Sequence, residues 1–243
     1  METIWLLVIP VALCASVVAS VAGTGGGVIL LPVLVSVFGV REAVPLYAVI
    51  LFSGNLSRVG MNWREIDFKV VGWFVLGAVP AAAVGSWLFT RMPDVGLLRI
   101  LGAFLLGSVA WRYLRRATKP GFPAHRFLGL GVVFSTISGV VGSAGPFLAP
   151  FYLSYGLAKG AFIGTEALGT AAMHITKLAT YQSLGAMSGS IWLRGLALAP
   201  VMIVGSYVGK RILERIPSAA FVRIVEVTIA GFGVWFLVRP PGG

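Results

Sequence analysis

Residues 164 to 181 read GTEALGTAAMHITKLATY, a polar stretch in an otherwise apolar chain. Its polar side chains recur at helical spacing: Glu166, Thr170, His174, Lys177 and Tyr181. At about 100° per residue, an α-helix gathers these five side chains within roughly 80° of arc. Ionisable side chains are costly inside a membrane, so the stripe is expected to face a polar interior and not lipid. The pattern favours a substrate or proton path, with a purely structural buried ion pair as the alternative.

The composition predicts a polytopic, all-α membrane protein. The 243 residues are 58% hydrophobic and only 11% charged, with a mean hydropathy of +0.94. Several apolar runs approach or exceed the roughly 20 residues that cross a bilayer. The net charge of +11 is scattered over short loops, which the positive-inside rule explains without a nucleic-acid partner. We therefore expect a multi-pass protein of the cell (inner) membrane, with its apolar N-terminal run retained as the first span.

Apolar runs and their breaks divide the chain into about eight long spans and two short segments. The short segments, 28–38 and 146–156, follow glycine-rich stretches at 23–27 and 142–145. Each short segment makes only about 16 Å of helix, which is half a membrane. The expected long spans are residues 3–22, 43–61, 69–90, 94–112, 127–142, 160–184, 192–213 and 218–238.

The order of the breaks repeats, which predicts two homologous halves. Gly27 aligns with Gly145 at an offset of 118 residues, and Arg58 aligns with Lys177 at an offset of 119. The expected organisation is a membrane repeat at 1–117, a basic cytoplasmic connector at 118–126 and a second repeat at 127–243.

Two topologies of these halves stay open. If the short segments do not cross, each half has four spans and the halves run parallel. If they cross as tilted pieces, each half has five spans and the halves are inverted. The inverted version gathers more of the basic loop residues on one side, as the positive-inside rule favours.

Paired, glycine-broken helices are typical of secondary transporters, whose substrate lies between the repeats near the membrane midplane. Broken helix ends offer backbone N–H groups to anions, and glycine lets the backbone approach a ligand. Arg58 and Lys177 add two inward cations, so the expected partner is a small anion. The alternatives are glycines that only permit tight packing, and an Arg58 that snorkels to the interface. The expected substrate-binding residues are Thr24, Gly25, Gly26, Gly27, Asn55, Arg58, Ser143, Gly145, His174, Lys177 and Tyr181.

Glu166 and His174 are the candidates for proton coupling, because burial eases protonation of a carboxyl group and histidine titrates near neutral pH. The structural alternative is a salt bridge from Glu166 to Lys177 or to an arginine. A passive anion channel stays open, whereas an intramembrane enzyme is disfavoured because no HExxH or GxSxG motif occurs. We predict no catalytic residue, metal or cofactor, and a homodimer stays open.

The run GTGGGVILLPVL (23–34), then a basic residue and an alanine, resembles the TauE/SafE family of sulfite exporters. The resemblance extends to a related loop ahead of PFLAPFYLSYG (146–156), and it covers both halves. It implies a helical transporter with about eight spans and two related halves. It also implies sulfur-containing anions as substrates, such as sulfite, organosulfonates or related oxyanions. The second loop, VVGSAG (140–145), lacks the triple glycine of the first, which sets the two loops apart.

Overall fold

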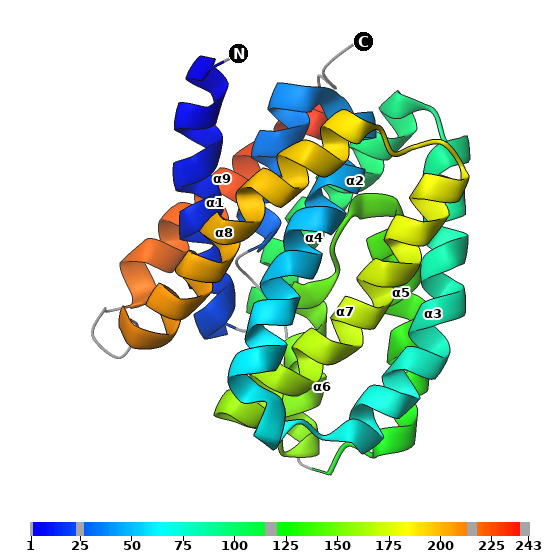
Figure 1. Cartoon of the computed structure of the whole chain (residues 1–243), viewed down its shortest axis with the longest axis vertical. Coiled ribbons are helices and arrows are strands. Elements are labelled where there is room, and N and C mark those ends of the chain that lie inside the picture. The colour runs from blue at the N-terminus through cyan, green and yellow to red at the C-terminus, as the bar shows by residue number, and fades with distance from the viewer. Residues whose placement is uncertain (1, 23–26, 115–120, 213–217, 239–243) are drawn as a thin grey trace.

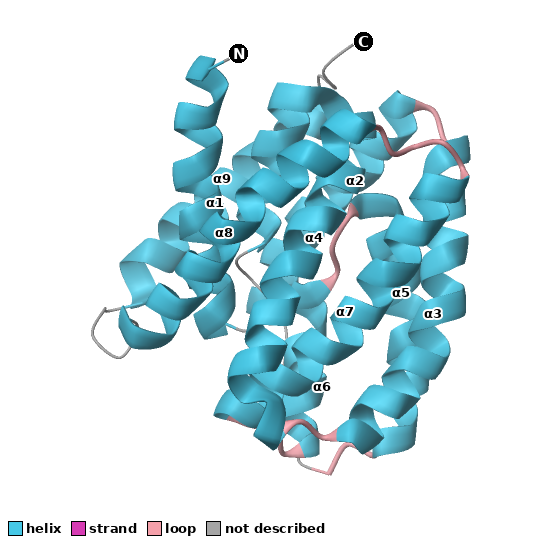
Figure 2. Cartoon of the chain, in the orientation of Figure 1, coloured by secondary structure: helices cyan, strands magenta, loops and turns pink. Residues whose placement is uncertain are grey.

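The computed structural model describes residues 2–22, 27–114, 121–212 and 218–238. Every regular element in these ranges is a helix, as the sequence predicted (Figures 1 and 2). The α-helices are α1 (Glu2–Ala22), α2 (Gly27–Asn62), α3 (Phe68–Arg91), α4 (Asp94–Leu114), α5 (Phe127–Val141), α6 (Gly145–Tyr155), α7 (Lys159–Ser183), α8 (Gly189–Ile212) and α9 (Ser218–Val238). Two short 3-10 helices, η1 (Trp63–Glu65) and η2 (Ala124–Arg126), precede α3 and α5.

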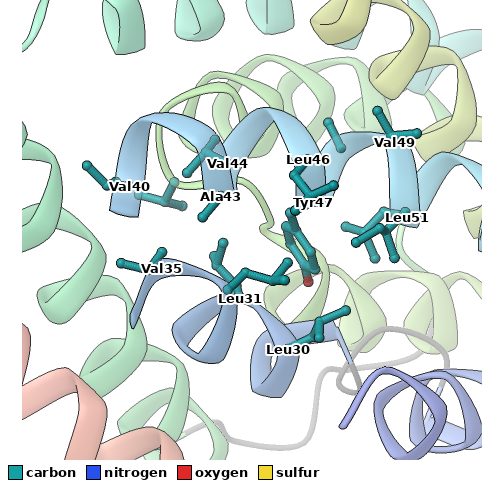
Figure 3. Packing of buried hydrophobic residues seen from close by; sticks show 14 of the residues in the cluster. Leu30, Leu31, Val35, Val40, Ala43, Val44, Leu46, Tyr47, Val49 and Leu51 are labelled. Atoms are coloured by element: carbon teal, nitrogen blue, oxygen red, sulfur yellow. The ribbon is translucent and has the colours of Figure 1, made fainter. Parts of the chain in front are cut away.

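Helix α2 is two helices joined at Gly39. This residue has φ 74° and ψ 162°, a backbone conformation that glycine adopts without a steric penalty. The chain folds back there, so Val35 lies beside Val40, and Leu30 lies on the same side of the hairpin as Leu51 (Figure 3). The first arm, 27–38, is the short segment that the sequence predicted.

The second short segment is α6, which has 11 residues and doubles back along α5. Gly142, with φ 93°, ends α5, and α6 begins at Gly145. The ring of Phe127 near the start of α5 lies 4.8 Å from that of Tyr152 near the end of α6. The predicted break at the second glycine cluster is therefore confirmed. The first cluster, at 23–26, lies outside the described residues.

Helices at aligned positions of the two predicted halves run in opposite directions. In Figure 1, α1, the second arm of α2, α4 and α8 descend, whereas α3, α5, α7 and α9 rise. The short arm of α2 rises and α6 descends. This direction pattern corresponds to the inverted alternative, in which each half contributes five helical passes.

Helices of the predicted first half pack against helices of the predicted second half. Helix α3 packs along α5, and α8 packs along α1, while α2 crosses α7 and α4 packs on α9. Glycines permit the closest approaches: a Cβ on Gly85 would overlap the Thr136 carbonyl of α5, and a Cβ on Gly205 would lie 2.6 Å from Ser16 Cβ of α1. Gly85 and Gly205 are aligned at an offset of 120 residues, so glycines at aligned sequence positions permit both close contacts.

Five helices of the described ranges are long and apolar enough to cross a membrane: Leu30–Glu65, Phe68–Arg91, Asp94–Trp111, Ala124–Val141 and Gly189–Val208. These correspond to five of the eight predicted long spans, and the count of eight stays a prediction. Helix α7 has 25 residues but is not one of the five. The polar stripe lowers the hydropathy of α7. The side chains of this stripe are buried inside the molecule.

Candidate functional site

The polar stripe of α7 faces the interior of the molecule. All five side chains, Glu166, Thr170, His174, Lys177 and Tyr181, are at most 5% exposed. Helix α7 packs against both α2 and α3. The prediction that these side chains turn away from lipid is confirmed.

Lys177 is fully buried at the broken end of α5. Its Nζ donates to the Gly142 carbonyl at 2.8 Å and to Ser138 Oγ at 3.2 Å. Carbonyls at a helix C-terminus lack helical partners and carry partial negative charge, so an ammonium group is stabilised there. Among the described residues no carboxylate pairs with Lys177, so its charge is met only by neutral groups.

Tyr181 fixes the same two helices to each other. Its hydroxyl donates to the Gly139 carbonyl at 2.5 Å, and its ring meets Phe89 edge to face at 5.3 Å. A Cβ on Gly139 would overlap the backbone of Gly85, so α5 is held tightly against α3 at this level. Lys177 and Tyr181 therefore stand on a rigid surface beside the break.

Arg58 of α2 is buried and points into the same region from the opposite half. One of its terminal nitrogens donates to Asn55 Oδ1, and the other lies 3.6 Å from Glu166 Oε2. Asn55 in turn donates to Thr170 Oγ1 at 3.0 Å. This network joins α2 to α7, and its burial shows that Arg58 does not snorkel to the interface. Of the two alternatives for Glu166, the ion pair with an arginine is the one that forms.

Besides Glu166 Oε2, two further polar groups of this cluster lie buried with no hydrogen-bond partner in the described part of the chain. They are the hydroxyl of Tyr47 and Nδ1 of His174. Tyr47 faces Ser143 and is within electrostatic range of Arg58. His174 is within electrostatic range of both Arg58 and Lys177. Buried polar groups are rarely left unpaired, so these two mark the region as more than a packing core.

The structure brings most of the predicted site residues into one region. Asn55 and Arg58 of α2 contact α7, and His174 lies within electrostatic range of Arg58. Lys177 and Tyr181 of α7 bond to the end of α5. Ser143 is buried in the turn before α6, Gly145 is the first residue of α6, and Gly27 is the first residue of α2. Thr24, Gly25 and Gly26 lie outside the described residues. Whether these groups bind substrate stays a prediction.

Sequence reasoning missed Ser138 and the Gly142 carbonyl as partners of Lys177, and it did not place Tyr47 among the binding residues. Ser138 sits four residues before the Gly142 break, where a hydroxyl lies one turn from the helix end, and this spacing was the available signal. Tyr47 is aligned with Glu166 at an offset of 119 residues. Within the described residues, no three His, Cys, Asp or Glu side chains gather where they could hold a metal ion.

Comparison with known proteins places this arrangement in a family. Residues 8–236 match the family described as "Sulfite exporter TauE/SafE". The chain belongs to the TauE/SafE family. It is 24% identical over 268 residues to the "Probable membrane transporter protein YunE" of Bacillus subtilis, covering 94% of this chain and 96% of that protein. It is also 24% identical over 187 residues to the "Probable inner membrane transporter protein TsaS" of Comamonas testosteroni, covering 74% of this chain and 76% of that protein.

No solved structure matches the chain. The TauE/SafE family supports a membrane transporter, and the apolar helices of the described ranges agree with a multi-pass membrane protein. The buried basic residues Arg58 and Lys177 thus lie inside a membrane transporter.

Proposed function

We propose that this TauE/SafE protein is a secondary transporter, working as an exporter, of small sulfur-containing anions such as sulfite or organosulfonates. One observation carries the proposal. Arg58 of α2 and Lys177 of α7, aligned residues of the two proposed halves, are both buried, and α2 packs against α7. Burying a cation inside a membrane is costly, and ionisable residues kept there commonly mark the path of a substrate or ion.

The charge balance of the site supports an anionic substrate. Glu166 is the acid that pairs with Arg58, and Lys177 has neutral partners only in the described part of the chain. The Ser143 hydroxyl and the second N–H of the Asn55 amide are suited to the oxygens of a sulfite or sulfonate group, whereas the Tyr181 hydroxyl already donates to Gly139. The specific sulfur chemistry is inferred from the description of the family.

The proposal includes two homologous halves of inverted topology, at 1–117 and 127–243, joined by the connector 118–126. The opposite helix directions and the swapped pairs α3 with α5 and α8 with α1 support it. In each half the α1-like, α2-like, α3-like and α4-like helices would be long spans, giving eight, with two short doubled-back segments. Such a pair of inverted halves can open the site alternately to either side.

The orientation in the membrane follows from charged loops. Arg64, Lys69, Arg126 and Lys159 lie at the lower end of the molecule in Figure 1. We place this end in the cytoplasm and the protein in the inner membrane, because basic loop residues stay on the cytoplasmic side. Glu166 and His174 are proposed as the proton-coupling residues.

Flux measurements in proteoliposomes test the proposed function. The purified chain is reconstituted, and efflux of sulfite, sulfoacetate, taurine, thiosulfate and sulfate is followed with and without a pH gradient. We expect saturable flux of one or more of the anionic compounds, responding to the pH gradient, with zwitterionic taurine moved poorly. Flux that does not saturate and follows only the membrane voltage would instead identify a passive channel. Absence of flux for every compound would contradict the proposal.

A further inference from the structure

The ion pair between Arg58 and Glu166 is loose. Arg58 Nη1 lies 3.6 Å from Glu166 Oε2, longer than the 2.7–2.9 Å typical of a charge-assisted hydrogen bond. Glu166 Oε2 is buried and accepts no hydrogen bond within the described residues. Another nitrogen of the guanidinium is bound to Asn55. A carboxylate held this way is poorly compensated for the water it has lost, so it is readily exchanged for another anion.

Two further buried polar groups lie within electrostatic range of Arg58. The hydroxyl of Tyr47 is buried without a hydrogen-bond partner in the described chain, as is Nδ1 of His174. Figure 3 shows the Tyr47 hydroxyl pointing inward from the second arm of α2 toward the arm that carries Leu30. An anion rich in oxygen atoms would supply the acceptor that the Tyr47 hydroxyl lacks. The Tyr47 hydroxyl can therefore donate to an oxyanion that takes the place of Glu166 on Arg58.

The net charge of the cluster differs between the ionised and the protonated state of Glu166. Arg58 and Lys177 carry one positive charge each when both are protonated, and Glu166 carries one negative charge when ionised. The cluster is then +1 with ionised Glu166 (two minus one) and +2 with protonated Glu166. A monoanion neutralises the first state and a dianion neutralises the second. Because net charge buried in a membrane is costly, a dianion is expected to bind to the second state.

Glu166 is the acidic member of the cluster, and charged or titratable groups lie around it on three helices. Arg58 faces it from α2, Tyr152 from α6, and His174 and Lys177 lie on its own helix. Glu65 and Asp67 lie at the lower end of α7, against Gly160 and Thr165 respectively.

We propose that the Glu166 carboxylate and a substrate oxyanion alternate on Arg58, so that a dianion binds together with one proton from water, taken up by Glu166. This rests on the proposed function and names the substrate charge class that is coupled to protons. A monoanion binds with Glu166 still ionised and takes up no proton. Proton coupling is then a property of the bound dianion, and the two ions move in the same direction.

Calorimetry on the purified full chain in detergent tests this. Sulfate serves as the dianion and methanesulfonate as the monoanion, at weakly alkaline pH, in buffers that differ in ionisation enthalpy. We expect about one proton taken up per sulfate bound and almost none per methanesulfonate. In the same range, sulfate affinity should fall about tenfold for each unit rise in pH, while methanesulfonate affinity stays level.

Two variants sharpen the measurement. Glu166→Gln should bind sulfate without proton uptake and without pH dependence. Glu42→Gln is the control, because Glu42 pairs with Arg194 at the partly exposed upper end and should leave proton uptake unchanged. Sulfate bound by the unmodified chain without proton uptake would overturn the inference, and so would undiminished uptake in Glu166→Gln. If the unmodified chain binds no anion, including sulfite, the proposed function itself fails. If Glu166→Gln does not fold, the pH dependence of sulfate affinity in the unmodified chain tests the inference.

Discussion

Arg58 on α2 and Lys177 on α7 are aligned in the two halves of the chain, and both are buried, yet their surroundings differ. Lys177 donates to a helix-end carbonyl and to a serine hydroxyl, all neutral groups. Arg58 faces the carboxylate of Glu166 and the amide of Asn55. Lys177 thus has neutral partners within the described residues, whereas the compensation of the Arg58 charge depends on the protonation of an acid.

This difference gives the two aligned cations distinct roles in the proposed transporter. The matched position would supply a positive charge in each proposed half, which suits an anion between them. Only the α2 cation faces a partner that can change its charge, which is Glu166 of α7. In the proposed mechanism the α7 cation sets the preference for anions, and the α2 cation links anion binding to protons. Three predictions test this difference between Arg58 and Lys177.

The largest effect is expected on stability when Arg58 is removed. Arg58→Met leaves Glu166 buried without its cation, which should lower the free energy of unfolding by about 3–5 kcal/mol. The double variant with Glu166→Gln should recover most of this loss, because no buried charge remains unpaired. Lys177→Met leaves only neutral acceptors unpaired and should cost less, about 1–3 kcal/mol. Equilibrium unfolding in detergent measures all four proteins, and equal losses for Arg58→Met and Lys177→Met without recovery in the double variant would contradict the distinction.

The next effect is on anion affinity at Lys177. Lys177→Ala should weaken sulfite binding on the order of 100-fold, since a buried charged partner of the anion is lost. Lys177→Arg keeps the charge and should retain part of the affinity. Lys69→Ala, an exposed lysine at the start of α3, is the matched control and should bind as the unmodified chain does. Calorimetric titration measures the affinities, and unchanged values in both Lys177 variants would remove this residue from the site.

The smallest effect is expected on stability when the close contacts between helices are disturbed. Gly85→Ala and Gly205→Ala should each lower the free energy of unfolding by about 1–3 kcal/mol, because the added methyl group meets the neighbouring helix. Gly72→Ala is the control: it is exposed with nothing within 4 Å, and alanine should gain up to about 1 kcal/mol in helix propensity there. Melting in detergent compares the three, and tolerance of Gly85→Ala equal to that of Gly72→Ala would mean that α3 and α5 are not held as described.

Much of the fold follows from local sequence. The helical spacing of Glu166, Thr170, His174, Lys177 and Tyr181 predicted one buried face, and the structure confirms it. Gly142 predicted a helix break, because its sequence context combines glycine with a following proline, and α5 ends there. The turn at Gly39 within the first half was expected only as the end of a short segment. These features depend on residues within a few turns of each other, so periodicity and composition are enough to find them.

The pairing of charges could not be found in this way. The sequence left Glu166 open to Lys177, eleven residues further on α7, or to an arginine elsewhere. Arg58 is 108 positions away, and its approach depends on how α2 crosses α7. Ser138 and the Gly142 carbonyl are likewise 39 and 35 residues from Lys177. Which polar atoms meet across helices is a matter of packing register, which no local pattern records.

The amino-acid sequence alone determined that this chain is an all-helical membrane protein with interrupted segments and a polar face on 164–181. It did so because hydrophobic length, helical period and glycine placement act over short distances. Only the tertiary structure decided that Glu166 faces Arg58, and that Lys177 faces the end of α5. These contacts join residues from separate helices, and their geometry is set by the close approach that glycines such as Gly85 and Gly139 permit.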